Sequence, residues 1–414
     1  MSLNKNNFKV CIIGLGYVGL PLLTRFALKG FDVIGYDINQ SRIDDLNNAI
    51  DRNNDINTNE IGRLLEVSKL SSNQDDLEGR NIFIVTVPTP INEDKTPNLD
   101  PIIKSSKLLG KYICKDSIVI YESTVYPGVT DEVCTPILEQ ESGLLFNKDF
   151  STGYSPERIV PGDKVNTIEK IKKVVSGSNQ EALSIISFIY TSIIDAGIHI
   201  APSIKIAEAS KVTENIQRDV NIALINELHQ MYSLLGIDSN EVIEAASTKW
   251  NFMKLKPGLV GGHCISIDPY YLMHKSLMIG YSPKLMTTAR NINDEMGAWV
   301  ITAFLKFIKE QNIDVHNINV TFLGYTFKEN CRDVRNTKVK ELIFSIKSMG
   351  IKVSLWDPLL EEVELEYLEK KGLKIYRSKP KSINFVFLCV QHDEILDFLK
   401  SFDGIIFDYK KIVL

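Results

Sequence analysis

Residues 8–37 read Phe-Lys-Val-Cys-Ile-Ile-Gly-Leu-Gly-Tyr-Val-Gly-Leu-Pro-Leu-Leu-Thr-Arg-Phe-Ala-Leu-Lys-Gly-Phe-Asp-Val-Ile-Gly-Tyr-Asp. A β-branched apolar run, Phe8 to Ile13, ends in a G-x-G-x-x-G turn. A helix-like stretch follows from Leu20 to Lys29, and a second apolar run from Phe31 to Tyr36 closes on Asp37. Strand, glycine turn, helix and strand in this order predict the opening unit of a Rossmann-type parallel sheet.

The glycine turn, in this context, predicts a dinucleotide cofactor. The first glycine permits a tight turn, the second lets the backbone approach a pyrophosphate, and the third allows close helix–strand packing at the helix N-terminus. Asp37 follows the last glycine by 18 residues and is expected to bind ribose hydroxyls and repel a 2′-phosphate, so NAD is favoured over NADP. Arg42 is a counter-signal, because a nearby Arg can accommodate a 2′-phosphate. The cofactor contacts predicted here are Gly14, Gly16, Tyr17, Val18, Gly19, Asp37 and Arg42.

Size and composition limit the remaining classes. A chain of 414 residues with 44% hydrophobic and 24% charged residues predicts an ordinary globular protein of two or three domains. The net charge of −5, without a dense Lys/Arg run, argues against nucleic acid, and the apolar runs are too short to span a bilayer. Six scattered cysteines without a CxxC pair, and an N-terminus without an apolar signal core, predict a reduced, cytoplasmic protein. No metal site is expected.

Loops after two further strands supply candidate site residues. The strand from Asn81 to Val87 is followed by Thr89, and the strand from Asp116 to Tyr121 by Thr124. In an open parallel sheet the ligand lies over the carboxyl ends of the strands, so both threonines are expected at the nicotinamide half of the cofactor. Either threonine could equally be a turn or N-cap residue.

Two polar sets lie in the middle of the chain. Glu157 and Arg158 share a turn after a strand, where they could serve a polar substrate or form a surface ion pair worth little. Ser203 to Leu235 has helical spacing of apolar residues without Gly or Pro, and predicts the longest helix, which would suit a dimer interface. One face of this helix carries Lys211, Asn215 and Arg218. That stripe predicts a site wall, the alternative being a solvated face.

A second glycine-rich turn precedes Cys264, with Asp268 four residues further on. A thiol on such a turn can be exposed and act as a nucleophile. The other interpretation is a small buried hydrophobe, as most free cysteines are.

The C-terminal third of the chain has a sequence pattern similar to that of the first third. Gly350 to Asp357 parallels Gly30 to Asp37, and a second Rossmann-type sheet is expected. This part lacks G-x-G-x-x-G and carries Lys328 and Arg335 among its basic residues, which fit a phosphate held by charge. The predicted fold class is α/β, with two Rossmann-like domains joined by a helical middle that has one long central helix. The expected boundaries are 1–200, 201–312 and 313–414.

Together these motifs resemble the UDP-glucose/GDP-mannose dehydrogenase family over nearly the whole chain. The motifs that carry the resemblance are Gly14–Gly19, Glu122–Gly128, Ser155–Arg158, Lys211 with Asn215, Gly261–Asp268 and Phe327–Thr337. The sequence Gly-Gly-His-Cys-Ile-x-x-Asp-Pro-Tyr-Tyr-Leu, preceded by Lys249-Trp-Asn-Phe252, is similar to the branch that acts on UDP-N-acetylhexosamines. Ser266-Ile267 departs from the Pro-Lys pair that is more frequent in the glucose branch.

The resemblance implies oxidation of a sugar C6 hydroxyl to an acid, with two NAD and one water. It implies that Cys264 attacks an aldehyde intermediate to give a thiohemiacetal, which is oxidised to a thioester and hydrolysed. Lys211 and Asn215 would stabilise the oxyanion. Lys211 or Asp268 would take protons through water.

The resemblance also implies further roles. Glu157 and Thr124 would position or activate the hydrolytic water, and Arg335 would reach the cofactor or the domain interface. Contacts to the sugar and diphosphate are implied for Arg158, Lys211, Asn215, Arg218, Gly261, Phe327 and Lys328. The partners expected are a UDP-sugar and further copies of the chain, as a homodimer or higher homo-oligomer, and the product would feed a surface polysaccharide such as O-antigen or capsule.

Three other functions remain open from the sequence. UDP-glucose or GDP-mannose could replace the UDP-N-acetylhexosamine, whose configuration, UDP-GlcNAc or UDP-GalNAc, the sequence leaves open. A two-electron dehydrogenase of the hydroxyacid type would share the N-terminal domain and the long helix, with Cys264 structural. A catalytically silent nucleotide-sugar sensor would bind the UDP-sugar without turnover.

Overall fold

The computed structural model describes residues 3–52, 55–159, 165–262, 264–315 and 317–411. The chain divides into two compact units, Met1–Glu214 with Tyr270–Tyr281, and Asn215–Pro269 with Ser282–Leu414. Each unit has its own sheet. The expected boundaries near residues 200 and 312 stay a prediction.

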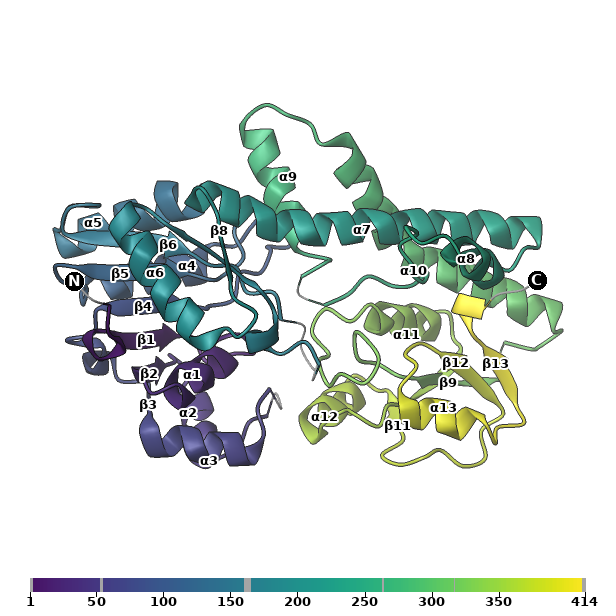
Figure 1. The fold of residues 1–414 in the computed structure, drawn as a ribbon. Coiled ribbons are helices and arrows are strands. Elements are labelled where there is room, and N and C mark those ends of the chain that lie inside the picture. The colour runs from purple at the N-terminus through teal and green to yellow at the C-terminus, as the bar shows by residue number, and fades with distance from the viewer. Residues whose placement is uncertain (1–2, 53–54, 160–164, 263, 316, 412–414) are drawn as a thin grey trace. The chain divides into compact units, whose positions relative to one another are not determined.

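The first unit is built on a sheet of eight described strands in the order β3-β2-β1-β4-β5-β6-β7-β8 (Figure 1). Neighbouring strands are parallel except β6 and β7, which are antiparallel. The first six positions have the order of a dinucleotide-binding sheet. The strands are β1 (Lys9–Ile13), β2 (Asp32–Tyr36), β3 (Lys69–Ser71), β4 (Ile82–Val85), β5 (Ser117–Tyr121), β6 (Phe150–Tyr154), β7 (Lys173–Gly177) and β8 (Ile198–Ile200).

Helices cover both faces of this sheet, because its central strands are apolar on both. Side chains alternate along a strand, so Val10 and Ile84 point to one face and pack with α1, α3 and α6. Cys11 and Phe83 point to the other face and are equally buried. The helices are α1 (Gly19–Leu28), α2 (Gln40–Asn47), α3 (Thr58–Val67), α4 (Asp100–Gly110), a π-helical turn η3 (Thr130–Cys134), α5 (Thr135–Ser142) and α6 (Gln180–Ile193), with short 3-10 turns η1 (Lys5–Asn7), η2 (Gln74–Leu77) and η4 (Ile168–Lys170).

The middle of the chain is helical. It contains α7 (Ile204–Leu235), α8 (Ser239–Ser247), α9 (Asp268–Met278) and α10 (Lys284–Glu310). The predicted long helix is α7, with 32 residues. Its apolar spacing does not form one buried stripe, since Ile206 and Leu224 are 49% and 51% exposed.

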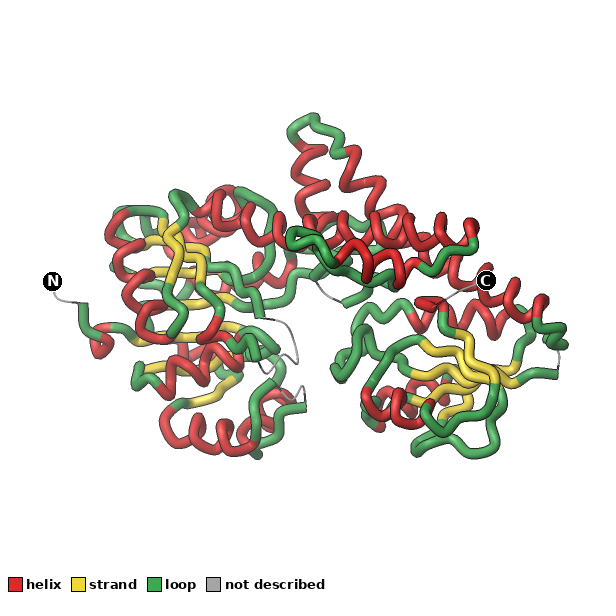
Figure 2. The backbone as a smooth tube through the Cα atoms, turned by 45° about the vertical axis from the view of Figure 1, so that its right-hand side comes forward, coloured by secondary structure: helices red, strands yellow, loops and turns green. Residues whose placement is uncertain are grey.

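The second unit has a five-stranded parallel sheet, counted over its described residues, in the order β11-β10-β9-β12-β13. Figure 2 shows the strands of each unit as a layer among helices. The elements are β9 (Asn319–Leu323), α11 (Val339–Ser348), β10 (Lys352–Trp356), α12 (Glu362–Lys370), β11 (Lys374–Ile375), β12 (Phe385–Leu388), α13 (Asp393–Leu399), β13 (Ile405–Phe407) and η5 (Tyr409–Lys411). The predicted fold class, α/β with two Rossmann-like sheets and a helical middle that holds one long helix, is confirmed.

The two sheets share one detail at the end of their second strand. In the first unit Leu15 N donates to Asp37 Oδ2 at 2.7 Å, and in the second Tyr325 N donates to Asp357 Oδ2 at 2.6 Å. Asp357 also accepts from His392 Nε2 at 3.2 Å. Because the Asn330 N–H donates to His392 Nδ1 (2.9 Å), the proton of the imidazole sits on Nε2, which lies 3.2 Å from Asp357 Oδ2 and 3.1 Å from Thr326 Oγ1. The sequence parallel between the halves is therefore also a parallel of hydrogen bonds.

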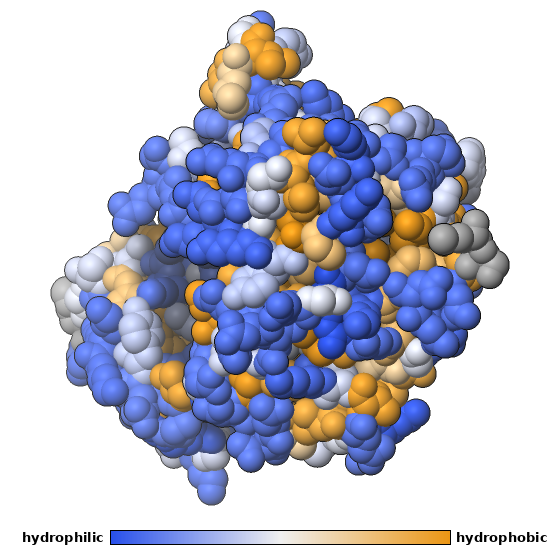
Figure 3. Space-filling view, turned by 90° about the vertical axis from the view of Figure 1, so that its left-hand side faces the viewer, coloured by the Kyte–Doolittle hydropathy of each residue, from blue (hydrophilic) through white to orange (hydrophobic). Residues whose placement is uncertain are grey.

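The surface is largely polar, as Figure 3 shows for one face, where hydrophilic side chains surround scattered apolar patches. Among the described helices, none is both long and apolar enough to cross a membrane.

Candidate active site

The glycine turn joins β1 to α1. Gly14 has φ +94°, which glycine adopts without strain, and its N–H donates to Tyr36 O at 2.8 Å. A Cβ on Gly19 would lie 1.8 Å from the Gly14 carbonyl oxygen, whereas one on Gly16 would meet nothing within 4 Å. Among the described residues no side chain caps α1 at Val18. N–H groups at an uncapped helix N-terminus, beside an open backbone, fit the pyrophosphate of a dinucleotide.

Asp37 and Arg42 stand beside this turn. The two carboxylate oxygens of Asp37 accept from Leu15 N (2.7 Å) and Asn39 N (2.9 Å), which leaves each with a further lone pair for a ribose hydroxyl. Arg42 donates to Leu15 O (3.0 Å) and pairs with Asp51 (2.7 Å). Because Asp51 neutralises Arg42, this corner suits a hydroxyl better than a 2′-phosphate.

The loop after β5, which carries Thr124, is tied to α7 by a buried carboxylate. Glu208 accepts from Gly128 N (2.5 Å) and Thr130 N (2.9 Å) and is fully buried. Burial raises the pKa of Glu208 to about 7, although both N–H groups favour the charged form. The helix turn that follows carries Lys211. The predicted cofactor residues Tyr17, Val18, Thr89 and Thr124 are half-buried.

A buried ion cluster holds Glu157. Lys173, the first residue of β7, is 3% exposed and donates to Glu157 Oε2 (2.6 Å) and Glu122 Oε2 (2.8 Å). The other Glu157 oxygen accepts from the next two backbone N–H groups, at 2.6 and 2.9 Å. Glu122 also accepts from the Tyr190 hydroxyl. The cluster therefore fixes the turn on which Arg158 stands.

The charges of this cluster follow from its contacts. Burial would raise the pKa of Glu157, but Lys173 and the two N–H groups hold that pKa below its usual range. Burial would lower the pKa of Lys173, but the two carboxylates raise it. The pKa of Glu122 is raised, because burial outweighs the attraction of Lys173. Lys173 thus lies between one carboxyl group whose pKa is lowered, Glu157, and one whose pKa is raised, Glu122. Arg158 pairs in turn with Glu214 of α7, at 2.7 Å.

Cys264 lies on the turn that leads into α9. Its carbonyl oxygen accepts from Asp268 N at 2.8 Å, and Gly262 O, on the other side, accepts from Ser266 Oγ at 2.7 Å. Cys264 is half-buried, whereas four of the six cysteines are buried. His263 lies outside the described residues. A partly accessible thiol on a braced turn fits a nucleophile better than a core residue.

Asn215 and Asp268 meet within the second unit, although they are far apart in the sequence. Asn215 Nδ2 donates to Asp268 Oδ2 at 2.5 Å, and the two residues are 8% and 2% exposed. Lys211, one turn earlier in α7, is 7% exposed. Arg218 of the same helix is exposed. The structure thus joins an amide donor and a carboxylate at the start of α9, four residues after Cys264.

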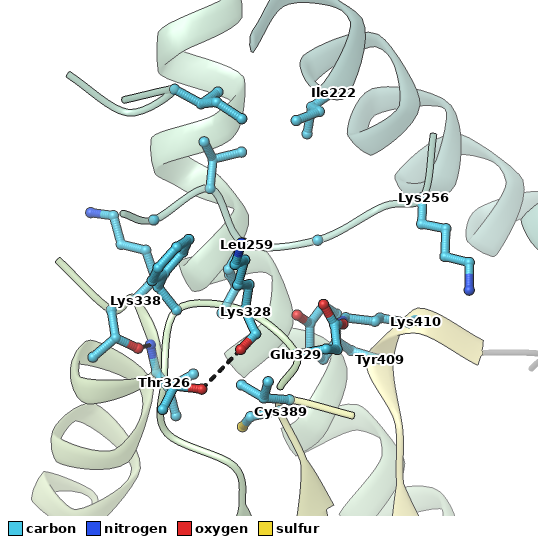
Figure 4. Close-up of a pocket in the computed structure, with 18 residues that line it drawn as sticks. Ile222, Lys256, Leu259, Thr326, Lys328, Glu329, Lys338, Cys389, Tyr409 and Lys410 are labelled. Carbon is cyan, nitrogen blue, oxygen red and sulfur yellow. Dashed lines mark hydrogen bonds and ion pairs between the residues drawn. The ribbon is translucent and has the colours of Figure 1, made fainter. Parts of the chain in front are cut away.

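The second unit also contains a cavity of about 250 Å³ beyond the carboxyl ends of β9 and β12 (Figure 4). Its polar lining is mainly cationic. Burial would lower the pKa of Lys410, but Tyr409 and Glu329 raise it, and the Lys410–Glu329 distance is 3.3 Å. Lysine ammonium groups in a cavity fit a diphosphate. The lining includes Lys256, Lys338 and Lys410 and, among the predicted substrate residues, Gly261, Phe327 and Lys328.

The turn after β9 links this cavity to the Cys264 turn. Asn336 Nδ2 donates to Gly262 O at 3.2 Å, and a Cβ on Gly262 would lie 2.9 Å from the ring of Phe327. Arg335, predicted at the cofactor or the domain interface, is held by Asp333 at 2.6 Å. The cavity wall and the Cys264 turn therefore contact each other within one unit.

Sequence reasoning missed the buried polar partners. Lys173 is the first residue of the run Lys-Val-Val-Ser-Gly, and Glu122 directly follows the apolar strand Ser-Ile-Val-Ile-Tyr. A lone charge at the end of such a run is the signal that could have marked both. Glu208, three residues before Lys211, could have been placed on the same helix face.

Comparison with known proteins gives matches along nearly the whole chain. Models of the UDP-glucose/GDP-mannose dehydrogenase family match in three parts: the NAD binding domain over residues 8–194, the central domain over 205–295, and the UDP binding domain over 321–413. The chain is 46% identical to Protein CapL of Staphylococcus aureus over 417 residues, covering 98% of this chain and 96% of CapL.

The chain is also 51% identical over 352 residues to the UDP-N-acetyl-D-glucosamine 6-dehydrogenase of Pseudomonas aeruginosa, with 85% and 83% of the two chains covered. Its fold is similar to that of the UDP-D-ManNAc dehydrogenase of Pyrococcus horikoshii, with a TM-score of 0.85, 27% identity, and 98% and 96% of the chains covered. The predicted NAD cofactor and enzyme class are confirmed by these matches. The chain therefore belongs to the UDP-glucose/GDP-mannose dehydrogenase family of NAD-dependent nucleotide-sugar dehydrogenases.

Proposed function

We propose that this enzyme oxidises the C6 hydroxyl of a UDP-N-acetylhexosamine, first of all UDP-N-acetylglucosamine, to the uronic acid. The observation that carries the proposal is the half-buried Cys264 thiol on a braced turn, four residues from the Asn215–Asp268 pair and in the same unit as the lysine-lined cavity. A nucleophilic thiol allows one site to perform two oxidations, because it converts an aldehyde into a better hydride donor.

NAD, when bound, accepts one hydride in each oxidation. Between the two oxidations, Cys264 Sγ adds to the aldehyde carbon, and the carbonyl oxygen takes up a proton to give a thiohemiacetal. After the second, water attacks the thioester carbon and the C–S bond breaks, which releases the acid and the thiol. We assign oxyanion stabilisation to Lys211 and Asn215, and proton uptake through water to Lys211 or Asp268. The pair formed by Asn215 and Asp268 supports this, since it orients both polar groups at the turn.

For Glu157 and Thr124 we propose a role in placing the hydrolytic water. Glu157 is held ionised by Lys173, which suits a group that orients water. The sugar and diphosphate are assigned to Arg158, Arg218, Gly261, Phe327 and Lys328.

The choice of sugar rests on sequence. The chain is more similar to the Pseudomonas aeruginosa UDP-N-acetylglucosamine enzyme, at 51% identity, than to the Pyrococcus horikoshii UDP-ManNAc enzyme, at 27%. The turn Gly-Gly-His-Cys-Ile with Lys249-Trp-Asn-Phe252 points to the same branch. We propose that the product is used for a surface polysaccharide and that the enzyme works in the cytoplasm, where its six cysteines stay reduced.

We also propose that the chain works as a homodimer or a higher homo-oligomer. In the second unit, Leu234 at the end of α7 is 84% exposed and Trp250 is 92% exposed. Large apolar side chains at such exposure are typical of subunit contacts. Sedimentation equilibrium of the wild type and of Leu234→Glu tests this, with a monomeric wild type as the contrary result.

The decisive experiment counts NADH released per sugar consumed, with UDP-GlcNAc, UDP-GalNAc, UDP-glucose and GDP-mannose. Two NADH per UDP-N-acetylhexosamine are expected. One NADH per sugar would mean a two-electron dehydrogenase, and two NADH from UDP-glucose or GDP-mannose alone would move the enzyme to another branch. Binding of a UDP-sugar without any NADH would indicate a sensor.

Two cysteine variants complete the experiment. Cys264→Ser should abolish formation of the acid while the Kd for NAD stays near that of the wild type. The matched control is Cys114→Ser, at an exposed cysteine, which should leave turnover unchanged. Wild-type turnover in Cys264→Ser would contradict the thioester mechanism.

A further inference from the structure

A buried asparagine on α7 forms hydrogen bonds with the segment that leads to Cys264. Asn226 is 0% exposed; its Oδ1 accepts from Gly258 N (2.8 Å) and its Nδ2 donates to Gly258 O (3.0 Å). Both backbone groups of one residue are thus satisfied by a single side chain, as a neighbouring strand would satisfy them. Among side chains, a primary amide offers both a donor and an acceptor in this geometry.

The Asn226 side chain is held in place by a chain of hydrogen bonds between further buried polar groups. The same Nδ2 of Asn226 donates to Asn293 Oδ1 on α10 at 2.9 Å. Asn293 Nδ2 donates in turn to Asp219 Oδ1 at 2.8 Å, and Arg290 pairs with that carboxylate at 2.6 Å. Asn293, Asp219 and Arg290 are at most 2% exposed. From Asn226 to Asn293 to Asp219 each amide donates to the next acceptor, so each amide has one permitted orientation, which holds Asn226 in place.

Gly258 is the point where this network reaches the site. It borders the cavity together with Lys256 and Leu259, which Figure 4 shows on the same segment. The other end of the segment is anchored at Gly262, through Ser266 Oγ (2.7 Å) and Asn336 Nδ2 (3.2 Å). The segment 258–262 is therefore held at two points, and Cys264 is two positions after the second in the sequence.

We infer that Asn226, held by Asn293 and the Asp219–Arg290 pair, is a positioning residue that sets the placement of Cys264 and of the adjoining cavity wall. The inference rests on the proposed role of Cys264 as nucleophile. Asn226 has no acid–base chemistry and is fully buried, so its effect on turnover passes through Gly258. A misplacement of a reacting group by about 1 Å can cost on the order of 100-fold in rate.

The test uses Asn226→Leu, which keeps the approximate size and removes both hydrogen bonds to Gly258. With UDP-GlcNAc, kcat is expected to fall roughly 10- to 100-fold and KM for the sugar to rise, while the Kd for NAD is unchanged. The matched control is Asn221→Leu, on the same helix, where the Nδ2 donates to the backbone oxygen of Gln217. That variant should behave as the wild type.

A second readout follows the thiol itself. In a Cys114→Ser background, the rate at which iodoacetamide alkylates Cys264 reports on the placement of this turn, because the remaining four cysteines are buried. The rate should change several-fold in Asn226→Leu and stay constant in Asn221→Leu. If wild-type enzyme released no NADH from any sugar, the proposed function would fail, but the alkylation rates would still decide the inference.

A third variant covers the case that Asn226→Leu does not fold. Asn226→Gln keeps donor and acceptor but pushes the amide about 1.5 Å further along, the length of one carbon–carbon bond. A positioning role predicts a lower kcat and an altered alkylation rate at nearly wild-type Tm. Wild-type kcat and wild-type alkylation in this variant, or in a folded Asn226→Leu, would overturn the inference.

Discussion

Replacing Lys173 by methionine should damage the first unit more than any surface charge change. The substitution keeps the length of the side chain but removes the cation that lies 2.6 Å from Glu157 and 2.8 Å from Glu122. Two carboxyl groups would then share a buried site with no cation between them. Breaking a buried pair in this way costs about 3–5 kcal/mol. For a unit of this size, each kcal/mol corresponds to about 2–4 °C, so the Tm should fall by roughly 6–20 °C.

The distribution of tryptophans makes this prediction easy to measure. Trp250, Trp299 and Trp356 all belong to the second unit, so tryptophan fluorescence reports on that unit, whereas far-UV circular dichroism reports on both. Lys173→Met should lower the transition seen by circular dichroism more than the transition seen by fluorescence. A loss below about 1 kcal/mol, the size of an exposed pair, would refute the argument that the charges are buried.

Two further arms separate charge from packing. Adding Glu122→Gln and Glu157→Gln to Lys173→Met removes the uncompensated charge, so the triple variant should recover most of the lost stability. In the single variant we expect burial to raise the pKa of both carboxyl groups above their unfolded values, because the cation that lowers these pKa values is gone. Stability is then lost as pH rises through this range, so the defect should shrink between pH 7 and pH 5. A defect that is independent of pH would indicate lost packing instead.

Three other changes test the cofactor cradle and the α7 tie. Asp37→Asn should weaken NAD binding roughly 10-fold or more, since a hydrogen bond to a charged acceptor is worth about 1.5–3 kcal/mol. It should also reduce the preference for NAD over NADP. An unchanged Kd for NAD in calorimetry would mean that the ribose lies elsewhere. Gly19→Ala should abolish NAD binding, because its Cβ would lie 1.8 Å from Gly14 O, whereas Gly62→Ala, whose Cβ meets nothing within 4 Å, should keep NAD binding and raise the Tm slightly. Glu208 has a pKa raised from 4.5 to about 7, so its contribution to stability is greatest below pH 4.5 and declines as pH rises to about 7. Urea unfolding at pH 5 and pH 7.5 should show this decline in the wild type, and a smaller one in Glu208→Gln.

The parts of the site that the sequence predicts well are local. The turn from Gly14 to Gly19 and the acid at Asp37 lie within one strand–helix–strand unit, so spacing alone orders them. The helix from Leu20 to Lys29 and the apolar strands on either side of it are predicted equally well, because apolar periodicity reflects burial in the element itself. The two-residue strand β11 and the three-residue strand β3 are not predicted, because two or three residues are too few to show a periodic pattern of apolar side chains.

The rest depends on contacts between distant segments. Asn215 and Asp268 are 53 positions apart, and Asn226 meets Gly258 across 32. The local sequence around each residue does not indicate its partner. A buried amide or carboxylate forms its hydrogen bonds with whichever polar group the fold places beside it. The long helix shows the same limit, because Leu224 keeps the helical spacing of a core residue yet is half exposed.

The hydrogen bond between His392 and Asp357 marks a difference between two sheets of like strand order at one equivalent position. An aspartate at the end of a second strand can accept a hydrogen bond from a ligand only where groups of the protein do not already occupy its carboxylate oxygens. Asp37 is partly exposed, whereas Asp357 is 5% exposed and its carboxylate already receives an imidazole and three backbone N–H groups. In the second unit this carboxylate is thus occupied by groups of the protein itself, and it braces the turn beside the cavity. In other chains with paired Rossmann halves, the accessibility of this one carboxylate should tell which half can bind ribose hydroxyls at the end of its second strand.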